Sequence, residues 1–288
     1  MPSLGADADD DVFSDVSDDE FLMGGASGDA AKSRDVYVSE CRRLETIELS
    51  HILGHLSGST ISLPHALIGD KGTMALAAAM RVNTCTTSLS LRANSITDVG
   101  AFMIADTMRL NATLTSLDLS QNQVTNAAGI AMVEALAKNV VITELSLSKN
   151  KLSDPFVEAA AVQLKEHPSL HTLDIGGNRV SAKGGRSLAT LVKSNRGSGH
   201  SLSALYVGWN DLGTTLLGIE GTTQLGAAAL GPQSWLLSLD LCFNGIDNAA
   251  GIQLAEALKE NSRLLLLDVS HNRFGVSEYA RSRGAQRI

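Results

Sequence analysis

The chain has 288 residues, of which 44% are hydrophobic and 19% charged, with a net charge of -8. No apolar run approaches the roughly 18 residues of a membrane span, and no basic region followed by an apolar stretch marks the N-terminus for secretion. The three cysteines are scattered without metal-ligand spacing, which favours a reducing compartment. We therefore expect a cytoplasmic protein with no membrane association.

Residues 1–34 are expected to form a disordered acidic tail. Nine acids and no Lys or Arg fall within residues 1–31, so the remainder of the chain is nearly neutral. Such a composition cannot bury enough apolar surface to fold. A neutral body with an acidic tail also argues against nucleic acid as a partner, because phosphate binding requires a basic surface.

The tail contains a candidate phosphorylation site. Ser17 precedes Asp18, Asp19 and Glu20, which matches an acidophilic kinase pattern with an acid three residues after the serine. Ser14 would gain a comparable acid if Ser17 were phosphorylated. The alternative is a solvated tail that keeps the protein soluble.

Residues 35–58 change character and predict a helical N-terminal cap. Apolar residues such as Val36, Cys41 and Leu44 recur at mostly helical spacing. A repeat array needs such a cap because its first unit otherwise exposes its core to water. A weak first unit follows, in which Ile61 and Leu63 lie one repeat period before Leu89 and Leu91, with Ala66 at the position of the later asparagines.

From residue 89 the motif L-x-L-x-x-N recurs seven times and defines a repeat. Its core positions also accept Ile or Val, as in the segment that ends at Asn178. The closing residues, at gaps of 28, 28, 28, 32, 34 and 28, are Asn94, Asn122, Asn150, Asn178, Asn210, Asn244 and Asn272. A fixed period in this range indicates a solenoid. Residues 59–288 are therefore predicted to be one repeat domain of about eight units, the last incomplete because residues 275–288 are mostly polar.

Each unit is predicted to contain a strand, a turn and a helix. The L-x-L segment alternates inward and outward, as a strand on a core does, and the asparagine can bond backbone groups in the turn and so link successive units. An Ala- and Leu-rich helical stretch follows. A second polar residue closes it at a constant offset from each repeat position, and we expect a left-handed backbone there: Asn83, Asn111, Asn139, His167, Asn195 and Asn261. The fold class is an α/β solenoid, a curved horseshoe with parallel strands on the concave face and helices on the convex face.

The motif L-x-L-x-x-N-x-I, a Gly about six residues on and an Ala-rich helix closed by Asn together resemble the ribonuclease-inhibitor-like class of leucine-rich repeats. The resemblance covers residues 59–274 and includes NOD-like receptors, Ran GTPase-activating proteins and ciliary scaffold proteins. It implies protein binding, and by analogy a cytoplasmic or ciliary location. The chain looks most like free-standing members without a nucleotide-binding domain, since it contains no G-x-x-x-x-G-K-[ST] loop.

Other members fit less well. Three Cys and two Trp are too few for ribonuclease inhibitor itself. Ran GTPase-activating proteins carry their acidic run after the repeats, and no counterpart of their arginine motif is found here. The leading interpretation is a non-catalytic, monomeric scaffold or adaptor that binds a protein of unknown identity. It needs no cofactor and no metal. A Ran-type GTPase-activating protein and the repeat fragment of a larger NOD-like receptor remain alternatives.

Strand alternation predicts where that partner binds. Outward positions in the first repeats are small and polar, whereas aromatic residues gather in the later ones, and binding hot spots favour Tyr and Trp. The predicted contact residues are Tyr206, Trp209, Asp240, Phe243, Asp268 and His271. Asp240 and Asp268, on neighbouring strands, would be close like charges that attract a Lys or Arg. Alternatively, an Asp between the core residues is simply common in such repeats, and Trp209 packs on the adjacent insertion.

The two longer gaps provide a second candidate for function. Residues 195–200 contain a short insertion, and residues 213–234 are expected to replace a regular helix with a Gly-rich stretch. Insertions in repeats map to loops and often to function. Decay of a repeat under weak constraint is the alternative.

Overall fold

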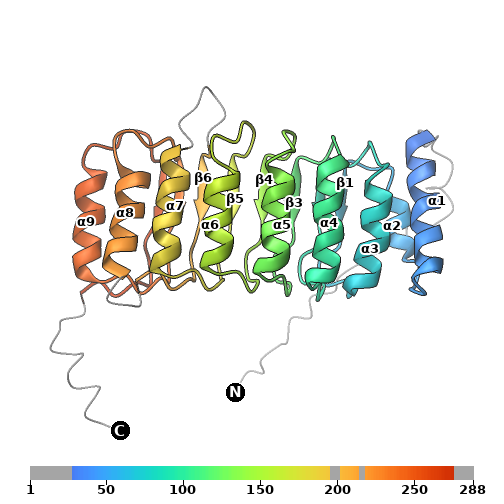
Figure 1. The fold of residues 1–288 in the computed structure, drawn as a ribbon, viewed down its shortest axis with the longest axis horizontal. Coiled ribbons are helices and arrows are strands. Elements are labelled where there is room, and N and C mark those ends of the chain that lie inside the picture. The colour runs from blue at the N-terminus through green and yellow to red at the C-terminus, as the bar shows by residue number, and fades with distance from the viewer. Residues whose placement is uncertain (1–27, 195–201, 214–217, 276–288) are drawn as a thin grey trace, which may run out of the picture.

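A single open sheet with helices on one side forms the molecule (Figure 1). The computed structural model describes residues 28–194, 202–213 and 218–275. Within these ranges eight strands pair in parallel and in chain order. They are β1 (Thr60–Ser62), β2 (Ser88–Ser90), β3 (Ser116–Asp118), β4 (Glu144–Ser146), β5 (Thr172–Asp174), β6 (Ala204–Tyr206), β7 (Ser238–Asp240) and β8 (Leu266–Asp268).

One helix separates each strand from the next, and two precede the sheet. The helices are α1 (Gly28–Arg43), α2 (Ser50–His55), α3 (Gly69–Met80), α4 (Asp98–Leu110), α5 (Asn126–Leu136), α6 (Asp154–Gln163), α7 (Ala182–Ser194), α8 (Gly218–Leu230) and α9 (Asn248–Leu258). Among the described residues, none of these helices combines the length and apolar character that crossing a bilayer requires.

The strand register follows the sequence period. Leu89 pairs with Leu117 and Leu117 with Leu145, whereas the two longer gaps appear at β5–β6 and β6–β7. The middle residue of β2 to β7 is buried against the helices and its two neighbours face away. Neighbouring strands lie about 4.8 Å apart and packed helices about 8–10 Å apart, so the sheet lies on the inside of the curve. We call the side of the sheet opposite the helices the strand face. The predicted α/β solenoid is confirmed.

Each repeat asparagine links its own turn to the repeat before it. Asn122 Oδ1 accepts hydrogen bonds from the backbone N–H groups of Asn94 and Ile96, both at 3.0 Å. Its Nδ2 donates to Leu91 O at 3.0 Å. The other six asparagines bond the preceding repeat in the same way. These side chains therefore satisfy backbone groups that the turn would otherwise bury without a partner.

The second polar row has a different backbone from the one expected. Asn111 has φ -76° and ψ 128°, and the described members of this row have no positive φ. Their side chains instead bridge repeats: Asn111 Nδ2 donates to Met80 O at 2.8 Å while its Oδ1 accepts from Leu114 N at 2.7 Å. His167 does the same with its two ring nitrogens. The expectation of a left-handed residue was wrong because the amide, not the backbone, carries the connection. Asn195 lies outside the described residues.

The cap begins earlier than expected and contains two helices. Helix α1 starts at Gly28, so residues 28–34 belong to it and not to the tail. They are helical because Ala30 and Ser33 are fully buried where α1 packs against α3, and Asp29 accepts a hydrogen bond from Thr84. The remainder of the tail, with Ser14 and Ser17, lies outside the described residues.

The Gly-rich stretch expected at residues 213–234 contains a regular helix, α8, with Leu225 and Leu230 in the core. Its glycines lie where neighbouring helices come closest: a Cβ on Gly221 would overlap the backbone of Ala182, and one on Gly226 the side chain of Leu254. Glycine here permits close helix packing. The insertion at residues 195–200 and most of residues 275–288 lie outside the described residues.

Candidate functional site

The strand face of the first repeats uses its polar groups internally. Ser90 Oγ donates to Asp118 Oδ2 at 2.8 Å, and Ser146 Oγ donates to Asp174 Oδ2 at 2.9 Å. In each pair the serine lies on the strand immediately before the carboxylate. The second oxygen of each aspartate accepts the backbone N–H two residues later, at 2.8 Å for Asp118 and 3.0 Å for Asp174. These carboxylates therefore have both oxygens bonded.

The same row changes composition at β6 to β8. Tyr206 occupies the position next to Asp240, and Asp240 the position next to Asp268, so neither carboxylate faces a serine on the preceding strand. Each still accepts the N–H two residues later, at 2.8 Å. Among the described residues no Lys or Arg lies within ion-pair distance of Asp240 or Asp268. The bond to Ser270 lowers the pKa of Asp268 further, which keeps that group ionised.

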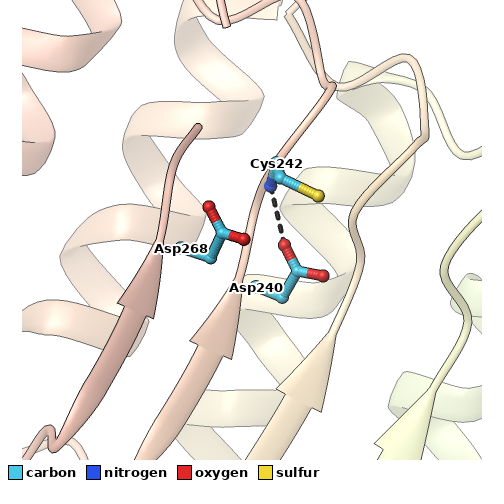
Figure 2. Close-up of side chains that lie close together, drawn as sticks. All are labelled: Asp240, Cys242 and Asp268. Atoms are coloured by element: carbon cyan, nitrogen blue, oxygen red, sulfur yellow. Dashed lines mark hydrogen bonds between the residues drawn. The ribbon is translucent and has the colours of Figure 1, made fainter. Parts of the chain in front are cut away.

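Cys242 joins these two carboxylates (Figure 2). One ligand atom each from Asp240, Cys242 and Asp268 lies within 4.8 Å of the others. Gly208 provides the room, because a Cβ there would lie 2.6 Å from Asp240 Oδ2 and 2.7 Å from Cys242 Sγ. Burial, with the negative charges of Asp240 and Asp268, raises the pKa of the Cys242 thiol to about 12. The thiol is therefore protonated at neutral pH.

This trio is the one group of metal-binding residue types that the described part of the chain brings together. Its chemistry does not favour a metal, since a metal binds the thiolate and this thiol is protonated. The absence of a metal site stays a prediction.

An exposed aromatic stack follows the three last strands. The ring centroids of Trp209 and Phe243 are 3.6 Å apart with an interplanar angle of 17°, and those of Phe243 and His271 are 4.1 Å apart at 14°. Each residue directly precedes a repeat asparagine and has a left-handed backbone, with φ of 58°, 51° and 54°. A repeated backbone conformation sends the three side chains in the same direction. Trp209 remains 57% exposed.

The structure thus gathers five of the six residues predicted to contact a partner. Trp209, Phe243 and His271 form the stack, and Asp240 and Asp268 precede it on the strands. Tyr206 lies in the aspartate row, half-buried between Asp174 and Asp240, and is not part of the stack. Whether these residues bind a partner stays a prediction.

A second exposed patch was not predicted. It lies before the strands, where Thr87, Thr115 and Thr143 of earlier repeats each bond the preceding repeat through Oγ1. Leu237 and Leu265 occupy this row in the last two repeats, exposed by 44% and 83%. The guanidinium carbon of Arg263 lies 3.7 Å from the centroid of the nearby Trp235 ring. The change from Thr to Leu at a fixed repeat position is the signal that would have found this patch.

A groove of about 610 Å³ opens beside the last strand. Helix α9 contributes Ile252, Leu254 and Leu258, and Leu267 and Phe274 complete the lining. The lining is almost entirely apolar, which is the composition of a helix–sheet interface and not of a catalytic cleft.

Sequence comparison agrees with this geometry. A family model described as "Leucine Rich repeat" matches residues 82–105, 110–133 and 166–189. The chain contains leucine-rich repeats. The comparison with curated proteins found no match.

Solved structures with similar folds include other proteins of this kind. Actin-binding site 2 of leiomodin-1 is 21% identical, over 49% of this chain and 79% of that chain, with a TM-score of 0.38. The Caenorhabditis elegans tropomodulin C-terminal domain is 14% identical, over 49% of this chain and 82% of that chain, with a TM-score of 0.41. The leucine-rich-repeat ectodomain of the Arabidopsis receptor kinase HAESA is 18% identical, over 86% of this chain and 38% of that chain, with a TM-score of 0.48. Similarities this weak carry no inference about a partner.

Proposed function

We propose that this protein is a non-catalytic interaction module that binds a protein partner on the strand face of β6 to β8. Leucine-rich repeats commonly mediate protein–protein interaction, and a solenoid presents an extended surface for it. The observation that carries the proposal is the exposed stack of Trp209, Phe243 and His271. Large aromatic side chains at a surface supply much of the energy of protein association when a partner covers them.

The contrast within the strand face supports this location. Repeats before β6 present small polar groups that already bond one another, so a partner would gain little by contacting them. From β6 onward the face combines exposed rings with carboxylates that lack a serine neighbour. The binding surface is therefore assigned to the last three strands and not to the whole curve.

The finer assignments belong to the same proposal. The ribonuclease-inhibitor-like type is supported by a strand register of constant spacing from β2 to β5 and by an α-helix between every pair of neighbouring strands. We propose a cytoplasmic, monomeric adaptor, and the family resemblance adds cilium or flagellum as a location to examine.

Proximity labelling in cells tests the proposal. The full chain fused to a labelling enzyme would be compared with a Trp209→Ala/Phe243→Ala variant. The matched control is Gln121→Ala/Lys149→Ala, which changes the same left-handed repeat position in two earlier units. We expect the aromatic variant to lose labelled partners that the wild type and the control retain, with circular dichroism showing that all three fold.

Identical partner sets for the two double variants would contradict the proposed surface. A separate assay addresses the catalytic alternative: GTP hydrolysis by candidate small GTPases with and without the full chain. Acceleration of hydrolysis would overturn the non-catalytic assignment.

A further inference from the structure

We propose that the surface of β6 to β8 recognises an arginine side chain in a basic segment of the partner, held between Asp240 and Asp268 and against the aromatic stack. This inference rests on the proposed function and specifies the chemistry of its partner. It follows from the hydrogen bonding of the carboxylates, the shape of the stack and the charge of the strand face.

The hydrogen bonding of the aspartate row leaves room for an external donor. Asp118 and Asp174 each receive a serine hydroxyl from the strand before them, whereas Asp240 has Tyr206 there and Asp268 has Asp240. The additional side-chain partner of Asp240 is the thiol of Cys242, which is a weak donor. Two like charges therefore lie close together, each with capacity for a strong donor from outside. A guanidinium offers several N–H donors in one plane and can bond carboxylates on two strands at once.

The aromatic stack favours a planar cation. Rings inclined by only 17° and 14° to one another form a ladder along one rim of the carboxylates. Phe243 directly follows Cys242, and His271 lies three residues after Asp268, so rim and row are adjacent along each strand. An arginine stacks on aromatic faces and pairs with carboxylates at the same time, which a lysine ammonium does less well. The molecule already contains such a contact, where Arg263 covers the Trp235 ring at 3.7 Å.

The charge of the strand face favours a basic partner. At the outward strand positions of β2 to β8 and the residue after each strand core, the charged groups are one cation, Arg92, and five acids: Asp118, Glu144, Asp174, Asp240 and Asp268. The cation lies in the β2 repeat, far along the sheet from the aromatic stack. A basic partner segment is therefore attracted to the face, and the row at β7 and β8 provides the specific contact.

The test measures binding of a fluorescein-labelled glycine-serine peptide that carries arginine, by fluorescence anisotropy on the full-length protein at low salt. Matched peptides carry lysine or citrulline, the neutral counterpart of arginine. The informative variant is Asp240→Asn/Asp268→Asn. Its control is Asp118→Asn/Asp174→Asn, which removes the same charge from the same row but at carboxylates already bonded by serine.

We expect the Asp240/Asp268 variant to weaken binding of the arginine peptide by about tenfold or more and the control variant to weaken it by less than about threefold. Trp209→Ala should also weaken it, and the citrulline peptide should not bind. Equal weakening by both double variants, or equal affinity for arginine and lysine, would overturn the inference. Neither result would affect the proposed function, which the proximity labelling tests independently.

A metal ion is the competing occupant. Zn²⁺ would be titrated into the wild type and a Cys242→Ser variant by calorimetry. Stoichiometric Zn²⁺ binding that Cys242→Ser abolishes, together with loss of peptide binding when Zn²⁺ is present, would overturn the arginine assignment in favour of a metal site. Absence of saturable Zn²⁺ binding would support arginine.

Discussion

The Asn122→Ala variant tests how the repeat asparagines hold the solenoid together. The substitution removes an acceptor from the backbone N–H groups of Asn94 and Ile96, and a donor from Leu91 O. Leu119 O, the other carbonyl that this side chain bonds at 3.0 Å, keeps the amide of Asn150 as a donor. The change therefore leaves two N–H groups and one carbonyl of the preceding repeat without a side-chain partner.

The expected cost is large. Asn94 and Ile96 are both fully buried, so water does not replace the lost acceptor. Leaving a buried donor unsatisfied costs roughly 1–3 kcal/mol, so two N–H groups place the loss at about 4 kcal/mol. A domain is typically stable by only about 5–15 kcal/mol. The variant should therefore unfold at a markedly lower urea concentration.

Urea unfolding followed by far-ultraviolet circular dichroism measures the loss, and hydrogen exchange locates it at the amides of Asn94 and Ile96. The local measurement matters because solenoids can unfold in parts. Gln123→Ala is the control, since this exposed side chain contacts only the exposed amine of Lys151. If Asn122→Ala and Gln123→Ala lowered stability by the same small amount, the asparagine bonds would not be what couples the repeats.

Two further predictions concern a close helix contact and a thiol. Gly221→Ala should destabilise the protein by about 2–3 kcal/mol, because a Cβ there meets the backbone of Ala182; Gly54→Ala, with open space around it, should cause no loss in the same urea assay. Cys242, with a pKa of about 12, should alkylate slowly at pH 9 and faster as pH rises, and Asp240→Asn should lower that pKa and raise the rate, as peptide mass spectrometry would show. The unfolded thiol has a pKa of about 8.5, so the folded state should lose stability as pH rises from about 9 towards 12. Alkylation of Cys242 as fast as that of an unfolded thiol would refute its burial.

The solenoid could be predicted from sequence because its linking groups are themselves periodic. An asparagine that bonds the preceding turn must recur once per repeat, so its spacing reports the register directly. The two longer gaps in the asparagine series reappear as the pairs Thr172–Ala204 and Ala204–Ser238. Longer connections changed the loops and left the strand pairing intact.

Helices whose stability depends on distant contacts were harder to predict. Gly is a poor helix former, so composition argued against helix at residues 218–230. The structure shows that Gly221 and Gly226 lie against α7 and α9, where any side chain would clash. Residues 28–34 are a similar case, because they order on α3 through Ala30 and Ser33. Local propensity does not contain these contacts.

The candidate site was predictable in its members and not in its hydrogen bonding. Strand alternation identified Asp118, Asp174, Asp240 and Asp268 as equivalent outward positions. Only the folded structure shows that the first two accept a serine hydroxyl and the last two do not. Cys242 was recognisable as outward-facing, but its approach to both carboxylates depends on the room that Gly208 leaves.

The asparagine row also determines where the aromatic stack can form. Each asparagine bonds backward, which explains why Ala66 is tolerated in the first unit: no earlier repeat exists for it to bond. The same direction makes Asn272 secure the last strand, through Leu241 O at 2.9 Å and the N–H of Ile246 at 3.0 Å. His271 directly precedes it and is thereby held over Phe243. The residue before each asparagine takes a left-handed backbone in every repeat from β2 onward, so aromatic side chains at this position in consecutive units must stack. The scaffold therefore supplies the geometry of the proposed binding surface, and the change of residue type at β6 to β8 supplies its chemistry.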